Sequence, residues 1–222
     1  MTRAVGFDLD NTLYDQTQHV FPFFSVAAAH LGQQTGILPA ALERTFREAW
    51  NALGPAHATL FDTVLERHCI HDPKHVRVLV RMYHDYVGQL EVYTGVQPLL
   101  ERLSERFQLF LITDGNAVMQ RRKVARLGIE HLFRVVVLSA ELGLGLQKPH
   151  PAPFVRALDL LQCAPDECLF AGDNPRADIG GAAHAGMKTV RVLTGPFAGD
   201  VVAGIEPDFV VGSVAQIDKV LR

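Results

Sequence analysis

The sequence predicts an α/β fold, with a three-layer, Rossmann-like core built on a parallel sheet and an inserted α-helical bundle. The apolar run at residues 4–7 ends in Asp8 and Asp10, a pattern typical of a buried strand that breaks into a polar loop. Residues 16–90 show helical periodicity throughout. From residue 94 onward, runs of strand length alternate with helical stretches, which predicts a parallel sheet with right-handed crossovers.

The segment after the first acidic loop is predicted to be a bundle of four helices. Apolar residues at three- and four-residue spacing favour helices near 19–34, 42–53, 60–68 and 73–87, with Asp72 as N-cap of the last and Pro73 as its first residue. We therefore predict an α/β core domain of residues 1–15 plus 94–222 and a helical cap domain of residues 16–93. Because the insert begins beside the acidic loop, we expect it to act as a lid.

The remainder of the chain is predicted to supply the other strands and the helices between them. Strands are expected at 107–112, 135–138, 168–171, 189–193 and 209–211, and helices at 96–106, around 119–127, at 153–162, and up to residue 185. Each crossover is long enough to return the chain parallel to the preceding strand.

Composition narrows the classes of partner. A formal net charge of −3 provides no broad basic surface for nucleic acid. The charge-poor stretch at 16–42 is interrupted by Pro22, His30 and Gly32, so it is too short to span a membrane. Three cysteines without a CxxC pair indicate a reducing compartment. We expect a cytoplasmic protein that binds neither nucleic acid nor membranes, and both a monomer and a homodimer remain open.

Polar residues follow four of the predicted strands. Since the carboxyl ends of parallel strands meet at one edge of a sheet, these side chains are expected to converge. Neighbouring carboxylates repel one another, and a hard divalent cation relieves that repulsion. Carboxylates, a hydroxyl, a lysine and a metal together suit phosphoryl transfer. The residues are Asp8, Asp10, Thr113, Lys148, Asp173 and Asp178.

Each of these residues also has a purely structural interpretation. Asp8 and Asp10 could be solvated acids of an Asx-type turn after the first strand. Lys148 could be an exposed loop lysine, and Thr113 could cap the following helix. Asp173 and Asp178 could be acids favoured by a helix N-terminus. A zinc site at His68, His71 and His75 with Cys69 is not favoured, because Asp72-Pro73 breaks the helix that would align its ligands. Placement of all four motifs on one edge favours the functional interpretation.

The order and spacing of these motifs resemble those of the haloacid dehalogenase-like (HAD) superfamily, in the subfamily with a helical cap inserted after the first motif. The motifs are DLDNT, the threonine of LITDGN, the lysine of QKPHP, and GDNPRAD, and the resemblance covers nearly the whole chain. It implies that Asp8 attacks phosphorus and that Asp10 is the acid and base. Lys148 would neutralise charge, and Thr113 would hold the phosphoryl group.

The resemblance also implies a binding site and a metal site around these residues. The phosphoryl group would be bound by Thr113 and Lys148 together with Asn11, Asp114 and Gly115. Mg²⁺ would be held by Asp8, Asp173 and the backbone carbonyl of Asp10. The resemblance implies that Asp178 and Asn174 do not bind the metal directly but contact the residues or water molecules that do.

The second aspartate of the first motif favours phosphate chemistry over carbon–halogen cleavage, since a departing halide needs no proton and Asp10 could supply one. We predict a Mg²⁺-dependent phosphatase that hydrolyses a small phosphomonoester, such as a nucleotide or a sugar phosphate, through an aspartyl-phosphate. The alternatives are a sugar phosphomutase of the same family and a non-catalytic, ligand-binding member.

Overall fold

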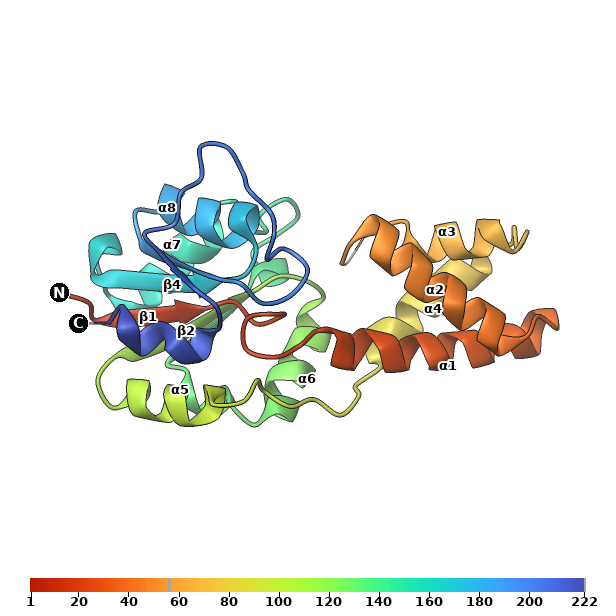
Figure 1. Ribbon diagram of the computed structural model, residues 1–222, viewed down its shortest axis with the longest axis horizontal. Helices are drawn as coiled ribbons and strands as arrows, with labels where there is room; N and C mark the ends of the chain where they lie inside the picture. The colour runs from red at the N-terminus through yellow and green to blue at the C-terminus, as the bar shows by residue number, and fades with distance from the viewer. Residues whose placement is uncertain (56, 222) are drawn as a thin grey trace. The chain divides into compact units, whose positions relative to one another are not determined.

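The structure is a computed structural model that describes residues 1–55 and 57–221. The chain divides into two compact units (Figure 1). The first combines residues 1–16 with 90–222 and contains the sheet, and the second comprises residues 17–89 and is helical. Within the described residues, no helix has both the length and the apolarity required to cross a lipid bilayer.

The first unit is built on a six-stranded, wholly parallel sheet, which confirms the predicted fold class. The strand order is β3-β2-β1-β4-β5-β6, so the first strand lies in the centre between the second and the fourth. The central strands are buried on both faces, which explains why they appear in the sequence as continuous apolar runs. Their bounds are β1 Ala4–Phe7, β2 Gln108–Thr113, β3 Val135–Leu138, β4 Cys168–Gly172, β5 Lys188–Val192 and β6 Phe209–Val211.

Helices cover both faces of this sheet and complete three layers (Figure 1). On one face, α5 (Val96–Ser104) and α6 (Ala117–Leu127) pack on the sheet with the C-terminal 3₁₀ turn Val214–Lys219. On the other face, α7 (Ala152–Leu161) and α8 (Gly181–His184) bury a separate apolar cluster. Shorter 3₁₀ turns span Glu130–Leu132, Ser139–Glu141 and Pro165–Glu167.

The segment before α8 differs from the prediction. A single helix was expected to continue up to residue 185, but its first six residues, Pro175–Gly180, form a π-helical turn. The Asn174 side chain caps this turn by accepting hydrogen bonds from the backbone N–H groups of Arg176 and Ala177, each at 3.0 Å. The wider turn places Asp178 back against the end of β4, where Gly172 lies. π-turns of this kind are frequent at functional sites.

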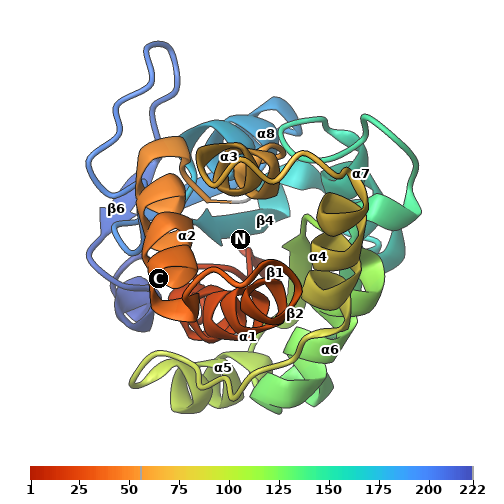
Figure 2. The same cartoon turned by 90° about the vertical axis from the view of Figure 1, so that its right-hand side faces the viewer.

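The helical unit contains α1 (Thr17–Thr35), α2 (Pro39–Leu53), α3 (Leu60–Arg67) and α4 (Lys74–Asp85), whose colours run from red through orange to dark yellow in Figure 2. Consecutive helices pack on one another, and α4 returns to α1. Its core is separate from the two clusters of the α/β unit and is rich in stacked and edge-on aromatic rings. The last helix begins one residue later than predicted, and Asp72 accepts a hydrogen bond from the backbone N–H of Lys74 at 2.9 Å.

Register explains how the motifs of the α/β unit come together. Phe7, at the end of β1, pairs with Leu111 of β2 on one side and with Ala171 of β4 on the other. The three central strands therefore end at nearly the same level, and the residues that follow them emerge at one edge of the sheet.

Candidate active site

The loop after β1 is a tight turn that fixes the first acidic residue. Asn11 has a φ of 63°, a left-handed conformation that asparagine tolerates better than most residues. The Thr12 hydroxyl then donates to Asp8 Oδ2 at 3.2 Å and accepts from the backbone N–H of Asp173 at 3.1 Å. Thr12 thus links the ends of β1 and β4, a positioning role that sequence reasoning did not identify.

Lys148 is buried between two carboxylates. Its Nζ lies 2.6 Å from Asp8 Oδ1 and 2.7 Å from Asp178 Oδ1, and it donates to the backbone carbonyl of Ile112 at 3.2 Å. The side chain is only 3% exposed, which excludes the interpretation as an exposed loop lysine. Asp114 accepts from the backbone N–H of Lys148 at 3.3 Å, so it orients the lysine backbone.

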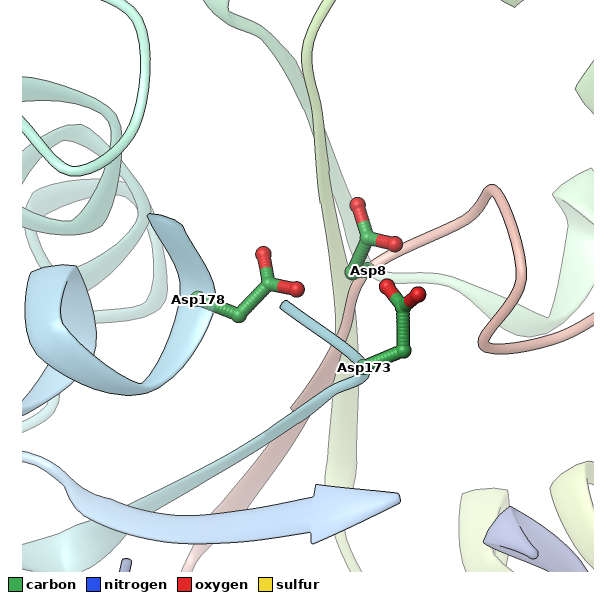
Figure 3. A group of neighbouring side chains, drawn as sticks. All are labelled: Asp8, Asp173 and Asp178. Carbon is green, nitrogen blue, oxygen red and sulfur yellow. The ribbon is translucent and has the colours of Figure 1, made fainter. Parts of the chain in front are cut away.

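Three carboxylates meet at this edge. One oxygen from each of Asp8, Asp173 and Asp178 lies within 4.8 Å of the other two, and the three side chains converge in Figure 3. Asp178 uses both of its oxygens, one for Lys148 and one for the backbone N–H of Asn174 at 3.0 Å. Asp173 Oδ2, in contrast, is buried and has no hydrogen-bond partner in the described structure. That oxygen is available to a cation.

Proton affinities reflect the crowding of these acids. Burial, reinforced by Asp178, raises the pKa of Asp8 to about 7, even though Lys148 acts in the opposite direction. Burial and repulsion from Asp178 and Asp8 raise the pKa of Asp173 to about 9. Burial would lower the pKa of Lys148, but Asp178 and Asp8 raise it overall, so this lysine remains charged.

The donor set fits a divalent metal ion. When all four carboxylates of the described cluster are ionised, they outnumber its two ammonium groups by two negative charges, which a divalent cation would offset. Hard divalent cations prefer oxygen ligands, and Mg²⁺ in particular is commonly bound by one or two carboxylates with water and phosphate oxygens. The groups counted are Asp8, Asp10, Asp173 and Asp178 against Lys123 and Lys148.

Asp10 has a different set of partners. Its Oδ1 accepts from Lys123 Nζ at 2.7 Å and from the Tyr14 hydroxyl, and its Oδ2 accepts from Gln120 Nε2 at 2.7 Å. Burial alone would raise the pKa of Asp10, but the Lys123 ammonium and the three hydrogen bonds lower it overall.

Lys123 and Gln120 were missed by sequence reasoning, although a signal was present. Both lie on the buried face of α6 among Met119, Val124 and Leu127. A lysine four residues after one apolar core position and four before another is a polar group placed where core residues are expected.

The remaining residues predicted to bind the phosphoryl group lie at or just after the ends of β1 and β2. Thr113 is buried at the end of β2 and its Oγ1 accepts from Gln120 Nε2 at 2.5 Å, while Asn116, not Thr113, caps α6. Gly115 has a φ of 110°, which a side chain would strain. The Asn11 side chain is engaged by Gln16 at 3.2 Å, so its predicted contact with substrate stays a prediction.

Fold and site together define an α/β enzyme whose buried acid–lysine cluster is suited to transfer of a phosphoryl group. The chain belongs to the haloacid dehalogenase-like hydrolase family, whose profile matches residues 2–186. This confirms the resemblance inferred from the four motifs.

Curated relatives are phosphatases. Glyceraldehyde 3-phosphate phosphatase of Methanopyrus kandleri is 37% identical over 203 residues, which cover 89% of this chain and 86% of the relative. Phosphoserine phosphatase of Thermus thermophilus is 32% identical over 176 residues, covering 79% of this chain and 63% of the relative. The prediction of a phosphoric monoester hydrolase is therefore confirmed.

Solved structures share the fold across two chemistries. A HAD phosphatase from Thermococcus onnurineus superposes with a TM-score of 0.71 at 22% identity, covering 99% of this chain and 98% of that one. A 2-haloacid dehalogenase from Pseudomonas syringae gives 0.66 at 26% identity, covering 100% and 98%. The fold alone therefore does not choose between phosphate and halide chemistry, and the side chains at the strand ends have to be considered.

Proposed function

We propose that this protein is a Mg²⁺-dependent phosphatase that hydrolyses a small phosphomonoester through a covalent intermediate on Asp8. The observation that carries the proposal is the position of Asp8. Lys148 contacts one of its oxygens, and Asp173 lies beside it in the cluster of three carboxylates. A carboxylate beside a fixed cation and a metal site is suited to attack phosphorus, because both neighbours offset the charge of the incoming phosphate.

The proposed reaction has two displacements at phosphorus. In the first, an Asp8 oxygen forms a bond to phosphorus as the bond to the ester oxygen breaks, and Asp10 gives that oxygen a proton. In the second, water attacks phosphorus as Asp10 takes its proton, which releases phosphate and restores the Asp8 carboxylate. Acid–base assistance of this kind typically contributes about 10²–10⁴-fold to the rate.

The other side chains have supporting roles in this proposal. Thr113, Gly115 and Lys148 hold the phosphoryl oxygens, and Lys148 also neutralises Asp8. Mg²⁺, held by Asp8, Asp173 and the backbone carbonyl of Asp10, would supply positive charge to the phosphoryl oxygens. Through its contacts with Lys148 and the Asn174 backbone, Asp178 fixes the lysine.

For the substrate, we propose a three-carbon phosphomonoester. The support is that the relatives described above are named for glyceraldehyde 3-phosphate and phosphoserine, which are both compounds of this size. The division into a core of residues 1–15 plus 94–222 and a cap of residues 16–93 is part of the proposal, with substrate selection assigned to the cap. Phosphate release across a panel of three-carbon phosphates, sugar phosphates and nucleotides tests this assignment.

The chemistry is tested with p-nitrophenyl phosphate and Mg²⁺. We expect Asp8→Asn to lower kcat by about 10³-fold or more, as loss of a nucleophile does in other enzymes. Asp159→Asn, an exposed acid on α7, is the matched control and should retain activity. Acid quenching of wild-type enzyme during turnover, followed by borohydride reduction, should convert Asp8 to homoserine. Full activity of Asp8→Asn, or of wild-type enzyme after exhaustive chelation, would contradict the proposal.

A further inference from the structure

The Asp10 carboxylate is held by donors from two different elements. Tyr14 lies in the same loop as Asp10, whereas Gln120 and Lys123 project from α6, more than a hundred residues further along the chain. Gln120 and Lys123 are each only 1% exposed to solvent. Removing an ammonium group from water costs several kcal/mol, so a lysine at this depth requires a compensating contact, and Asp10 Oδ1 at 2.7 Å provides one.

The two oxygens of Asp10 are used unequally. Oδ1 accepts from both Lys123 and Tyr14, which engages both of its lone-pair directions. Oδ2 accepts from Gln120, which leaves one lone-pair direction on this oxygen for a proton. The donors thus fix the plane of the carboxylate and distinguish one oxygen from the other.

We infer that Lys123 is a positioning residue, which together with Gln120 orients Asp10 so that Oδ2 passes the proton to the departing ester oxygen. This inference rests on the acid–base role proposed for Asp10 above. The same Gln120 amide also donates to Thr113 Oγ1 at 2.5 Å. The α6 face therefore connects the acid after β1 with the hydroxyl at the end of β2, and a shift of the helix would disturb both.

A purely structural role for Lys123, in which it only attaches α6 to the loop, makes a different prediction. Loss of a structural contact would slow the enzyme with every substrate alike. Loss of a correctly placed acid slows mainly those substrates whose leaving group requires a proton. p-Nitrophenolate departs without protonation, whereas an alkoxide needs it. The ratio of kcat/KM for the two kinds of ester separates the two roles, because kcat/KM reports the steps up to departure of the leaving group.

The experiment compares p-nitrophenyl phosphate with the best alkyl phosphate of the substrate panel. For Lys123→Met, which keeps a side chain of similar length, we expect kcat/KM to fall about 10²-fold with the alkyl ester and less than about tenfold with the nitrophenyl ester. Gln120→Met should show the same bias, and it serves as the second variant if Lys123→Met does not fold. The matched control is Arg121→Met on the same helix, α6. It removes an exposed charge that is paired with Glu141 and should leave both kcat/KM values unchanged.

A second comparison separates this inference from the proposed function. Asp10→Asn alone must show the leaving-group bias; if it does not, both the acid role of Asp10 and the positioning role of Lys123 are wrong. If Asp10→Asn shows the bias and Lys123→Met does not, only the role of Lys123 is overturned. In the Asp10→Asn background, adding Lys123→Met should cause no further loss with the alkyl ester. A full multiplicative loss there would mean that Lys123 does not act through Asp10.

Discussion

At the scale of single residues, the absence of one side chain shapes the acid cluster. A Cβ at Gly172, the last residue of β4, would lie 2.4 Å from the Asp178 side chain. This close approach lets Asp178 reach both Lys148 and the backbone of Asn174. Gly172, which ends a buried strand directly before an acidic motif, is thus needed because it has no side chain, and not because its backbone is left-handed.

Gly172→Ala should therefore impair catalysis by moving Asp178. Because misplacement of a catalytic group by about 1 Å can cost about 10²-fold, we expect kcat with p-nitrophenyl phosphate to fall by roughly that factor at saturating Mg²⁺. Gly199→Ala is the control, since a Cβ at Gly199 meets no atom within 4 Å. Wild-type kcat in Gly172→Ala would show that the cluster tolerates displacement of Asp178.

The three thiols are expected to differ in reactivity. Cys69 is exposed, whereas Cys163 and Cys168 are buried. Burial raises the pKa of Cys168 to about 12, and the nearby Cys163 adds to this effect. Very little of the reactive thiolate of Cys168 is therefore present at pH 8. Ellman's reagent should modify one thiol per chain in the native protein and all three after denaturation. Loss of the fast reaction in Cys69→Ser would identify the thiol, and rapid native modification of more than one would contradict the burial.

At the scale of elements, the strands could be predicted from the sequence more reliably than the contacts between helices and loops. Strands buried on both faces produce apolar runs that need no tertiary information, and β4, expected at 168–171, is buried along its length and ends one residue later, at Gly172. The contacts of α6 could not be predicted in this way. The pairing of Lys123 with Asp10 spans 113 residues and depends on where the helix packs, while a lysine in an amphipathic helix is by default assigned to the surface.

The same distinction applies to the candidate site. Asp8, Lys148 and Asp173 could be predicted because each belongs to a motif with a fixed position relative to a strand end. Thr12 could not be distinguished from an ordinary turn residue, because its importance comes from accepting a hydrogen bond from the Asp173 backbone 161 residues away.

The central strand β1 tolerates little added volume. A Cβ at Gly6 would lie 2.2 Å from the ring of Phe110 on β2. We expect Gly6→Ala to lower the free energy of unfolding by about 1–3 kcal/mol, the usual cost of overpacking a core, which exceeds the gain of about 0.4–1 kcal/mol from restricting the unfolded chain. Urea denaturation followed by circular dichroism measures the change.

Two further variants control this prediction. Gly199→Ala should change the free energy of unfolding by no more than about 0.5 kcal/mol. Phe110→Leu in the Gly6→Ala background should recover part of the loss, because the smaller side chain makes room for the methyl group. Independent, additive effects of the two substitutions would argue against the predicted clash.

At the scale of the whole molecule, the separation of the apolar cores has consequences for unfolding. The two clusters around the sheet contain residues of the α/β unit alone, and the third contains residues of the helical unit alone. The acid cluster also belongs wholly to the α/β unit. A metal ion bound there contributes its binding free energy to the folding of that unit.

The single tryptophan makes this separation measurable. Trp50 is on α2 in the core of the helical unit, so its fluorescence reports that unit, whereas circular dichroism reports both. We expect the two urea transitions not to coincide, because each unit has its own core. Mg²⁺ at about 100 times its Kd should stabilise the α/β unit by about 2.7 kcal/mol and leave the Trp50 midpoint unchanged. Asp173→Asn should abolish the Mg²⁺ shift, and a single transition that Mg²⁺ moves equally for both probes would show that the units unfold as one.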